Sequence, residues 1–98
     1  MKEITAKEVE ERLLRNEELH VIDVREVEEV AEGKIKGVLP IRLGLLEFRM
    51  HELDKHKEYI IVWRSGGRSA RAVQFLESYG FQAINMVGGM LAWEGKVV

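Results

Sequence analysis

Six consecutive residues near the middle of the chain combine side chains and backbone freedom suited to binding a small anion. They are Arg64, Ser65, Gly66, Gly67, Arg68 and Ser69. Arginine side chains pair with oxyanions, and glycines let backbone N–H groups approach a ligand closely. The loop is therefore predicted to bind an anion such as sulfate or phosphate. In the structural alternative, the same residues only begin a helix, with solvated arginines and with glycines in turns that need a positive φ.

The segments on either side of the loop predict how it is positioned. Residues 59–63 form an apolar run with the length and β-branched content of a buried strand. A helical pattern follows the loop and is expected to end at Gly80. Its core-facing residues are predicted to be Ala72, Val73, Phe75, Leu76 and Tyr79. A strand, a glycine loop and a helix in this order bring backbone N–H groups together at the helix N-terminus, which favours an anion or a thiolate.

The hydroxyls and imidazoles of the chain form no catalytic or metal-binding pattern. No histidine and acid lie near Ser65 or Ser69 in the sequence to activate them, so both serines are predicted to cap the following helix. His20, His51 and His56 lack the spacing of metal ligands. We therefore expect neither a metal nor a cofactor.

Composition narrows the class of protein. With 98 residues, of which 46% are hydrophobic and 33% charged, the chain is expected to form one domain, residues 1–98. The formal net charge of −2 gives no reason to expect nucleic acid as a partner. No apolar run is long enough to span a bilayer and the N-terminus lacks the apolar core of a signal peptide, so no membrane contact and a cytoplasmic location are expected. The chain has no cysteine, which excludes disulfides, thiolate metal sites and thiol catalysis.

Strand and helix patterns alternate along the rest of the chain. Further strands are expected near Ile4 and over 19–24 and 81–87. Residues 34–41, which contain the only proline, are expected to form a turn and a short segment of the kind found at a sheet edge. This alternation predicts a parallel α/β sheet with helices on both faces.

The first helix is predicted to begin with a capping box, in which Thr5 accepts from the first turn and Glu8 reaches back. Further helices are expected after Glu26, ending at Gly33, over 43–53, and after Gly89. The core-facing residues predicted for these four helices are Ala6, Val9, Leu13 and Leu14; Val27, Val30 and Ala31; Leu45, Leu46, Phe48, Met50 and Leu53; and Met90, Leu91 and Trp93.

Four blocks of sequence, in order along the chain, resemble the rhodanese-like domain family. They are Val21-Ile22-Asp23-Val24-Arg25-Glu26, Glu32-Gly33-Lys34-Ile35-Lys36-Gly37, Trp63-Arg64-Ser65-Gly66-Gly67-Arg68-Ser69 and Val87-Gly88-Gly89-Met90-Leu91-Ala92-Trp93. They are similar to the family's Asp-Val-Arg-Glu strand end, its Gly-His-Ile-Pro-Gly-Ala turn (with Lys at the His and Pro positions), its Cys-Arg-Ser-Gly-x-Arg-Ser active-site loop and its closing Gly-Gly-x-x-Ala-Trp. The resemblance covers about residues 4–95. It implies a three-layer α/β sandwich around a five-stranded, mostly parallel sheet.

The resemblance also implies a chemistry for which one group is missing. In the family the first loop residue is a cysteine, which carries a persulfide while sulfur passes from a donor to an acceptor, and flanking arginines hold the anionic donor. The corresponding residue here is Trp63, whose indole can neither attack nor carry sulfur. Removing a nucleophile of this kind costs on the order of 10⁶ in rate, or about 8 kcal/mol. Sulfur transfer, desulfuration and phosphate hydrolysis by a cysteine are therefore not expected.

Three placements of Trp63 are open from the sequence: in the space that an anion would use, turned inward as a core residue, or exposed over the loop as an anchor for a partner. Asp23 and Arg25 resemble a family pair at a strand end, where they either brace neighbouring loops or contact a substrate. The resemblance further implies that residues 47–56 cover the mouth of the site.

These patterns favour a catalytically inactive rhodanese-like domain that acts as a binding or regulatory module. Its expected partner is a protein or a small anion (sulfate, thiosulfate or phosphate), bound by residues 64–69 with Asp23 and Arg25 in support, and the chain is expected to be a monomer. One alternative is a thiosulfate or persulfide sulfurtransferase-family protein whose activity is lost through the change from Cys to Trp63. Another is a structural domain with no ligand.

Overall fold

Five strands form one parallel sheet in the computed structural model, which describes residues 1–65 and 67–98. The strands are β1 (Glu3–Thr5), β2 (His20–Asp23), β3 (Leu39–Pro40), β4 (Glu58–Val62) and β5 (Gln82–Val87). Their order across the sheet is β1-β5-β4-β2-β3, and each neighbouring pair runs parallel. The predicted parallel sheet is confirmed, with the proline-containing β3 at its edge, where a missing N–H is tolerated.

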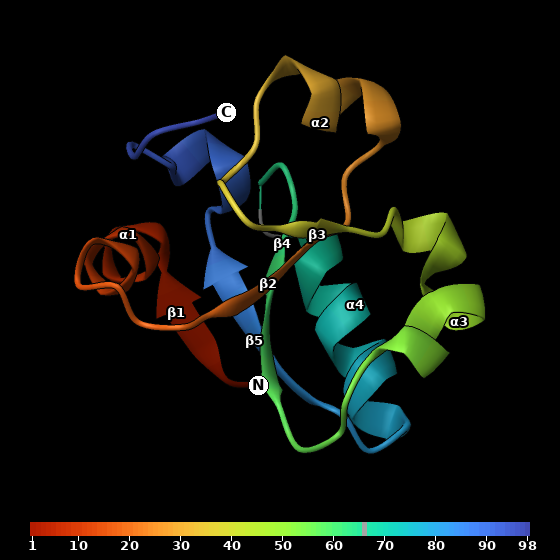
Figure 1. Cartoon of the computed structure of the whole chain (residues 1–98). Coiled ribbons are helices and arrows are strands. Elements are labelled where there is room, and N and C mark those ends of the chain that lie inside the picture. Colours follow the sequence, from red (N-terminus) through yellow and green to blue (C-terminus); the bar gives the residue numbers. More distant parts are fainter. Residues whose placement is uncertain (66) are drawn as a thin grey trace.

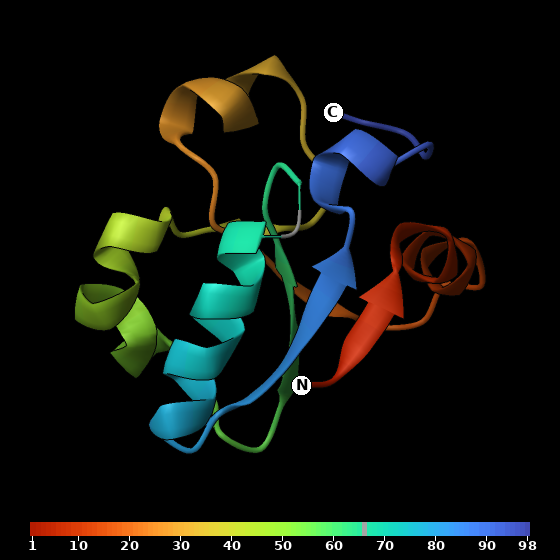
Figure 2. The ribbon, with the colours of Figure 1, turned by 180° about the vertical axis from the view of Figure 1, so that it is seen from behind.

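Helices cover both faces of this sheet. They are α1 (Ala6–Leu14), α2 (Val27–Glu32), α3 (Leu46–Arg49) and α4 (Gly67–Ser78), with short 3₁₀ turns η1 (Leu43–Leu45), η2 (Met50–Glu52) and η3 (Gly89–Ala92). Figure 1 and the reverse view in Figure 2 show α1 and η3 on one face, α3 and α4 on the other, and α2 above the carboxyl ends of the strands. The predicted three-layer α/β sandwich is therefore confirmed.

The side chains of the central strand alternate between two separate cores. Tyr59 and Ile61 belong to the buried cluster under α3 and α4, whereas Ile60 and Val62 belong to the cluster under α1. Trp63, the first residue after β4, lies in the same cluster as Tyr59 and Ile61. Because successive side chains of a strand point to opposite faces, the strand itself directs the side chain of residue 63 towards α4.

Several residues predicted to face the core are exposed instead. Wrong in this respect are Leu14, Val27, Ala31, Phe48, Tyr79 and Leu91, and Phe48 exposes 73% of its surface. The reason is that the covering elements are short, so only part of each apolar stripe meets the sheet. α2 lies at the end of the sheet, not over a face, and has no buried residue. The segment 43–53 is three short pieces, so continuous helical spacing does not describe it.

The boundaries of the elements follow local hydrogen bonding. The Glu8 N–H donates to Thr5 Oγ1 at 3.0 Å, which confirms Thr5 as the N-cap of α1. The Glu8 carboxylate accepts from Arg12 (3.0 Å), one turn further along the helix. Gly80 ends the turn after α4 with a φ of +87°, as glycine readily does.

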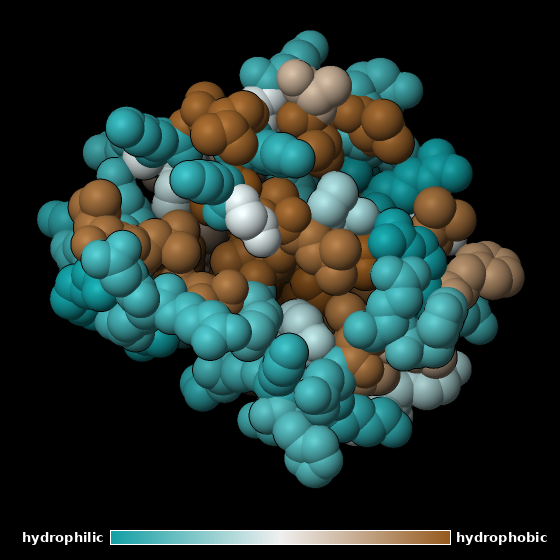
Figure 3. Space-filling model, in the orientation of Figure 1, coloured by the Kyte–Doolittle hydropathy of each residue, from teal (hydrophilic) through white to brown (hydrophobic). Residues whose placement is uncertain are grey.

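The surface matches the highly charged composition. Figure 3 shows hydrophilic side chains over most of one face, with hydrophobic ones gathered towards its middle, between α1 and α3. On the α3 side, a side-chain hydrogen bond from Arg49 holds the pKa of Glu52 below its ordinary value. In the described part of the chain, no helix has both the length and the apolar character needed to cross a bilayer.

Candidate functional site

Trp63 is a core residue that also forms part of the wall of a surface cavity. Its side chain is only 7% exposed and packs in the cluster that contains Ile61, Ala72 and Val73. The guanidinium carbon of Arg68 lies 5.1 Å from the centre of the indole ring, a cation–π contact. Of the three placements open from the sequence, the inward one is therefore correct, and an exposed anchor is excluded.

A cavity of about 520 Å³ lies beside the indole, at the carboxyl end of β4. Its lining residues are Glu29, Trp63, Arg64, Ser65, Gly67 and Arg68. The structure thus brings together four of the six loop residues predicted from sequence. The fifth, Gly66, lies outside the described residues, and the sixth, Ser69, is buried behind the loop. Since the cavity remains open beside Trp63, the indole does not fill the whole of the space available to a ligand.

Ser69 connects the first turn of α4 to the sheet. It is fully buried, and its hydroxyl donates to Oδ1 of Asn85 on β5, which is itself buried. Sequence reasoning missed Asn85, although an amide between Ile84 and Met86 in an apolar stretch was a usable signal. A buried amide needs a partner, and Ser69 is one that the fold supplies.

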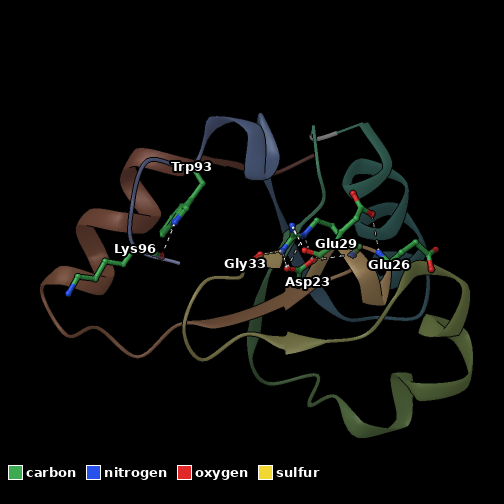
Figure 4. Close-up of polar contacts among 7 residues, drawn as sticks. Asp23, Glu26, Glu29, Gly33, Trp93 and Lys96 are labelled. Carbon is green, nitrogen blue, oxygen red and sulfur yellow. Dashed lines mark hydrogen bonds and ion pairs between the residues drawn. The ribbon is translucent and has the colours of Figure 1, made fainter. Parts of the chain in front are cut away.

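Asp23 and Arg25 form a buried ion pair that holds α2 against the end of β2. Asp23 is fully buried and Arg25 is 7% exposed. Arg25 donates from Nη2 to Asp23 Oδ2 at 2.8 Å and from Nε to both carboxylate oxygens. Its guanidinium also donates to the carbonyl of Gly33 at 2.8 Å and to that of Glu29 at 3.4 Å (Figure 4). Neither member of the pair lines the cavity, so their geometry is that of a brace between two segments.

Glu29 is the cavity residue that the sequence did not reveal. It lies on α2, and its Oε1 accepts from the backbone N–H of Glu26 at 3.2 Å, as Figure 4 shows. A glutamate on a short surface helix is ordinarily a solvated residue, so no local pattern distinguished it. The segment 47–56, implied by resemblance to cover the site, contributes none of the lining residues; among the described residues the opposite wall comes from α2.

The Gly88-Gly89 turn fixes the backbone of the loop from the other side. The Met90 N–H donates to the Trp63 carbonyl at 2.8 Å, and the Leu91 N–H donates to that of Arg64 at 2.9 Å. Gly89 has a φ of +55°, and a Cβ on it would lie 2.4 Å from the Trp63 carbonyl oxygen. Only glycine allows this approach, so the closing Gly-Gly block positions the candidate site.

Comparisons with known proteins agree with this architecture. The family model described as "Rhodanese-like domain" matches residues 5–96. A Bacillus subtilis protein named "Putative sulfurtransferase YtwF" is 47% identical over 96 residues, covering 98% of this chain and 93% of that protein. An Allochromatium vinosum protein named "Sulfurtransferase" is 34% identical over 92 residues, covering 93% and 86%. The crystal structure of a rhodanese-like domain protein from Staphylococcus aureus superposes with a TM-score of 0.92 at 38% identity, covering 98% and 93%.

The contact between the turn and the loop predicts a large effect of Gly89→Ala. The new Cβ meets backbone carbonyls that cannot move aside, and the positive φ adds strain, so we expect a loss of about 3 kcal/mol in the free energy of unfolding. Gly37→Ala is the matched control, because its φ of +84° is also positive but nothing lies within 4 Å of the new Cβ. It should lose only about 1 kcal/mol. Urea denaturation of both variants measures the difference, and equal losses would contradict the close contact.

The Asp23–Arg25 brace predicts strong dependence on both partners. Arg25→Met leaves the Asp23 carboxylate buried without its partner and should cost about 3–5 kcal/mol. Asp23→Asn combined with Arg25→Met should recover part of this loss, because no isolated charge remains buried. Arg12→Met, which breaks the exposed pair of Arg12 with Glu8, should cost about 0.5 kcal/mol or less. Thermal and urea unfolding test this order, and an Arg25→Met loss as small as that of Arg12→Met would rule out the brace.

Proposed function

The chain belongs to the rhodanese-like domain family, and we propose that it acts there as a binding or regulatory module, without sulfur transfer by a cysteine. One observation carries this proposal. The residue at the start of the active-site loop is Trp63, whose indole is packed into the core, and the sequence contains no cysteine that could replace it. Among the described residues, Arg64, Ser65, Gly67 and Arg68 line a cavity next to a position that has no nucleophile.

The chemical reason is specific to sulfur transfer. A persulfide forms when a thiolate attacks the outer sulfur of a donor, and its terminal sulfur is then taken by an acceptor. An indole has no sulfur to carry and no lone pair of comparable nucleophilicity. The serines do not replace it: Ser69 is buried and donates to Asn85, and Ser65 forms no hydrogen bond with a base among the described residues.

We propose that the ligand of the loop is a small anion. Arg64 and Arg68 are exposed, line the same cavity, and form no ion pair within the described residues. α4 begins at Gly67, so the positive end of its dipole is directed towards the loop. Sulfate, thiosulfate and phosphate fit this charge, and a protein partner that presents such a group would use the same contacts.

A second candidate function is that of a sulfurtransferase-family protein whose activity was lost through the change to Trp63. The names of the two relatives favour it, because both are called sulfurtransferases. In that case the loop would remain competent, and restoring the thiol would restore turnover. In the third interpretation, a structural domain without a ligand, the loop would respond to no anion.

Turnover measurements test the absence of sulfur transfer. With thiosulfate and cyanide, the protein should produce thiocyanate no faster than a protein-free control, and catalytic turnover would contradict the proposal. Trp63→Cys separates the first two candidates. We expect it to fold with a loss of about 3 kcal/mol and to stay inactive, because the indole both fills the core and supports Arg68. Recovered turnover in this variant would favour the second candidate instead.

Titration with sulfate, thiosulfate and phosphate tests anion binding. In ¹⁵N–¹H spectra, the amides of residues 64, 65 and 67–69 and the Trp63 indole N–H should shift with saturation. Arg64→Gln and Arg68→Gln should each weaken binding by about threefold to tenfold, because each removes one charged hydrogen-bonding group. Arg71→Gln is the matched control, since Arg71 is an exposed arginine of α4 that does not line the cavity. An absence of shifts in the loop would favour the structural interpretation.

A further inference from the structure

The geometry of the cavity points to a more specific ligand: we propose that it binds a small zwitterion, with the anionic group at Arg64 and Arg68 and an ammonium group at Glu29. This inference rests on the proposed binding function of the loop and names the class of ligand for the same site. It differs from simple anion binding because it gives the carboxylate on α2 a part in recognition.

Opposite charges line this cavity without neutralising each other. Arg64, Arg68 and Glu29 are all lining residues, yet no guanidinium nitrogen of the two arginines lies within 4.0 Å of a Glu29 carboxylate oxygen. If Glu29 had paired with either arginine across the cavity, that pair of charges would be neutralised within the protein. As they stand, a ligand with charges of both signs would pair with all three side chains together.

The Glu29 carboxylate is held in a defined position. Its Oε1 accepts from the Glu26 N–H at 3.2 Å, and its own backbone carbonyl accepts from Arg25. Within the described part of the chain, Oε2 has no hydrogen-bond or ion-pair partner. Figure 4 shows the Glu29 carboxylate turned back towards the Glu26 N–H at the start of α2. One oxygen is thus anchored while the other remains available to a ligand.

Arg68, on the wall of the cavity opposite Glu29, is also held in position. Arg68 lies over the ring of Trp63, which is itself fixed in the core. Such a contact limits the positions that a long side chain samples, so a negative group meets an ordered guanidinium. The ligand therefore lies between two charges whose positions depend on two different elements, the 63–68 loop and α2.

Charge and size both favour a zwitterion over a simple dianion. Two arginines and one glutamate line the cavity, so a simple dianion satisfies the arginines but offers Glu29 no positive partner. A volume of about 520 Å³ also exceeds what one tetrahedral anion fills and lies in the usual range of small-molecule sites. A molecule with an ammonium a few bonds from its anionic group satisfies both walls.

Taurine and isethionate provide a matched pair of probes. Both are two-carbon sulfonates, and they differ in carrying an ammonium or a hydroxyl group. We expect the protein to bind taurine about threefold to tenfold more tightly than isethionate, as one additional charge pair in a partly exposed site provides. The dissociation constants come from ¹⁵N–¹H titrations that follow the loop amides and the Trp63 indole.

The Glu29→Gln variant tests the role of the carboxylate. Glutamine keeps an Oε1 that accepts from Glu26 N–H, so the helix start is preserved while the charge is removed, and the taurine preference should fall to about one. Glu28→Gln, an exposed change on the same helix, should leave the preference intact. The unliganded spectra of both variants should match that of the parent outside α2, which excludes unfolding as the cause.

The possible outcomes separate this inference from the proposed function. Equal binding of both sulfonates by the parent protein would overturn the zwitterion and leave anion binding in place. Failure of every probe, sulfate and thiosulfate included, would overturn both. An equal loss of preference in Glu28→Gln and Glu29→Gln would assign the effect to the general charge of α2 and overturn a specific contact.

Discussion

The alternation of side chains along β4 is the constraint on which the site depends. It directs residues 59, 61 and 63 into one core and residues 60 and 62 into the other, so the residue that follows the strand also points into a core. With tryptophan at that position, the alternation buries a large ring under the loop. The loop backbone is then fixed from outside by the N–H groups of Met90 and Leu91.

A second constraint operates between the loop and α2. α2 has no buried residue, so hydrophobic packing contributes little to its position. The guanidinium of Arg25 supplies directional bonds to the carbonyl of Glu29 within the helix and to that of Gly33 directly after it. Buried ion pairs are weak evidence for stability, because desolvation offsets much of the attraction. Their directionality is what matters here: the Asp23–Arg25 pair determines where Glu29 lies relative to the loop.

The strands, their parallel arrangement and the loop could be predicted from the sequence, because short apolar runs and glycine turns depend mainly on nearby residues. The N-cap at Thr5 and the edge position of β3 were predictable for the same reason. The exposure of Phe48 and Leu91 could not be predicted, because apolar spacing does not show how much of a short helix contacts the sheet. Glu29 was missed because its role depends on where α2 lies, which is set by Arg25 through contacts distant in the chain.

The residues that build the site and the residues that give it charge form separate groups. Gly89, Ser69, Asn85 and the Asp23–Arg25 pair hold the backbone in place through close approach, buried hydrogen bonds and a buried ion pair. Arg64, Arg68 and Glu29 contribute little of this kind, and exposed charges on a surface stabilise a fold only weakly. Stability therefore does not explain why three unneutralised charges of both signs surround one cavity. The proposed recognition of a charged ligand would account for them and requires no nucleophile. Binding at this loop is therefore physically separable from the cysteine chemistry, for which this chain has no residue.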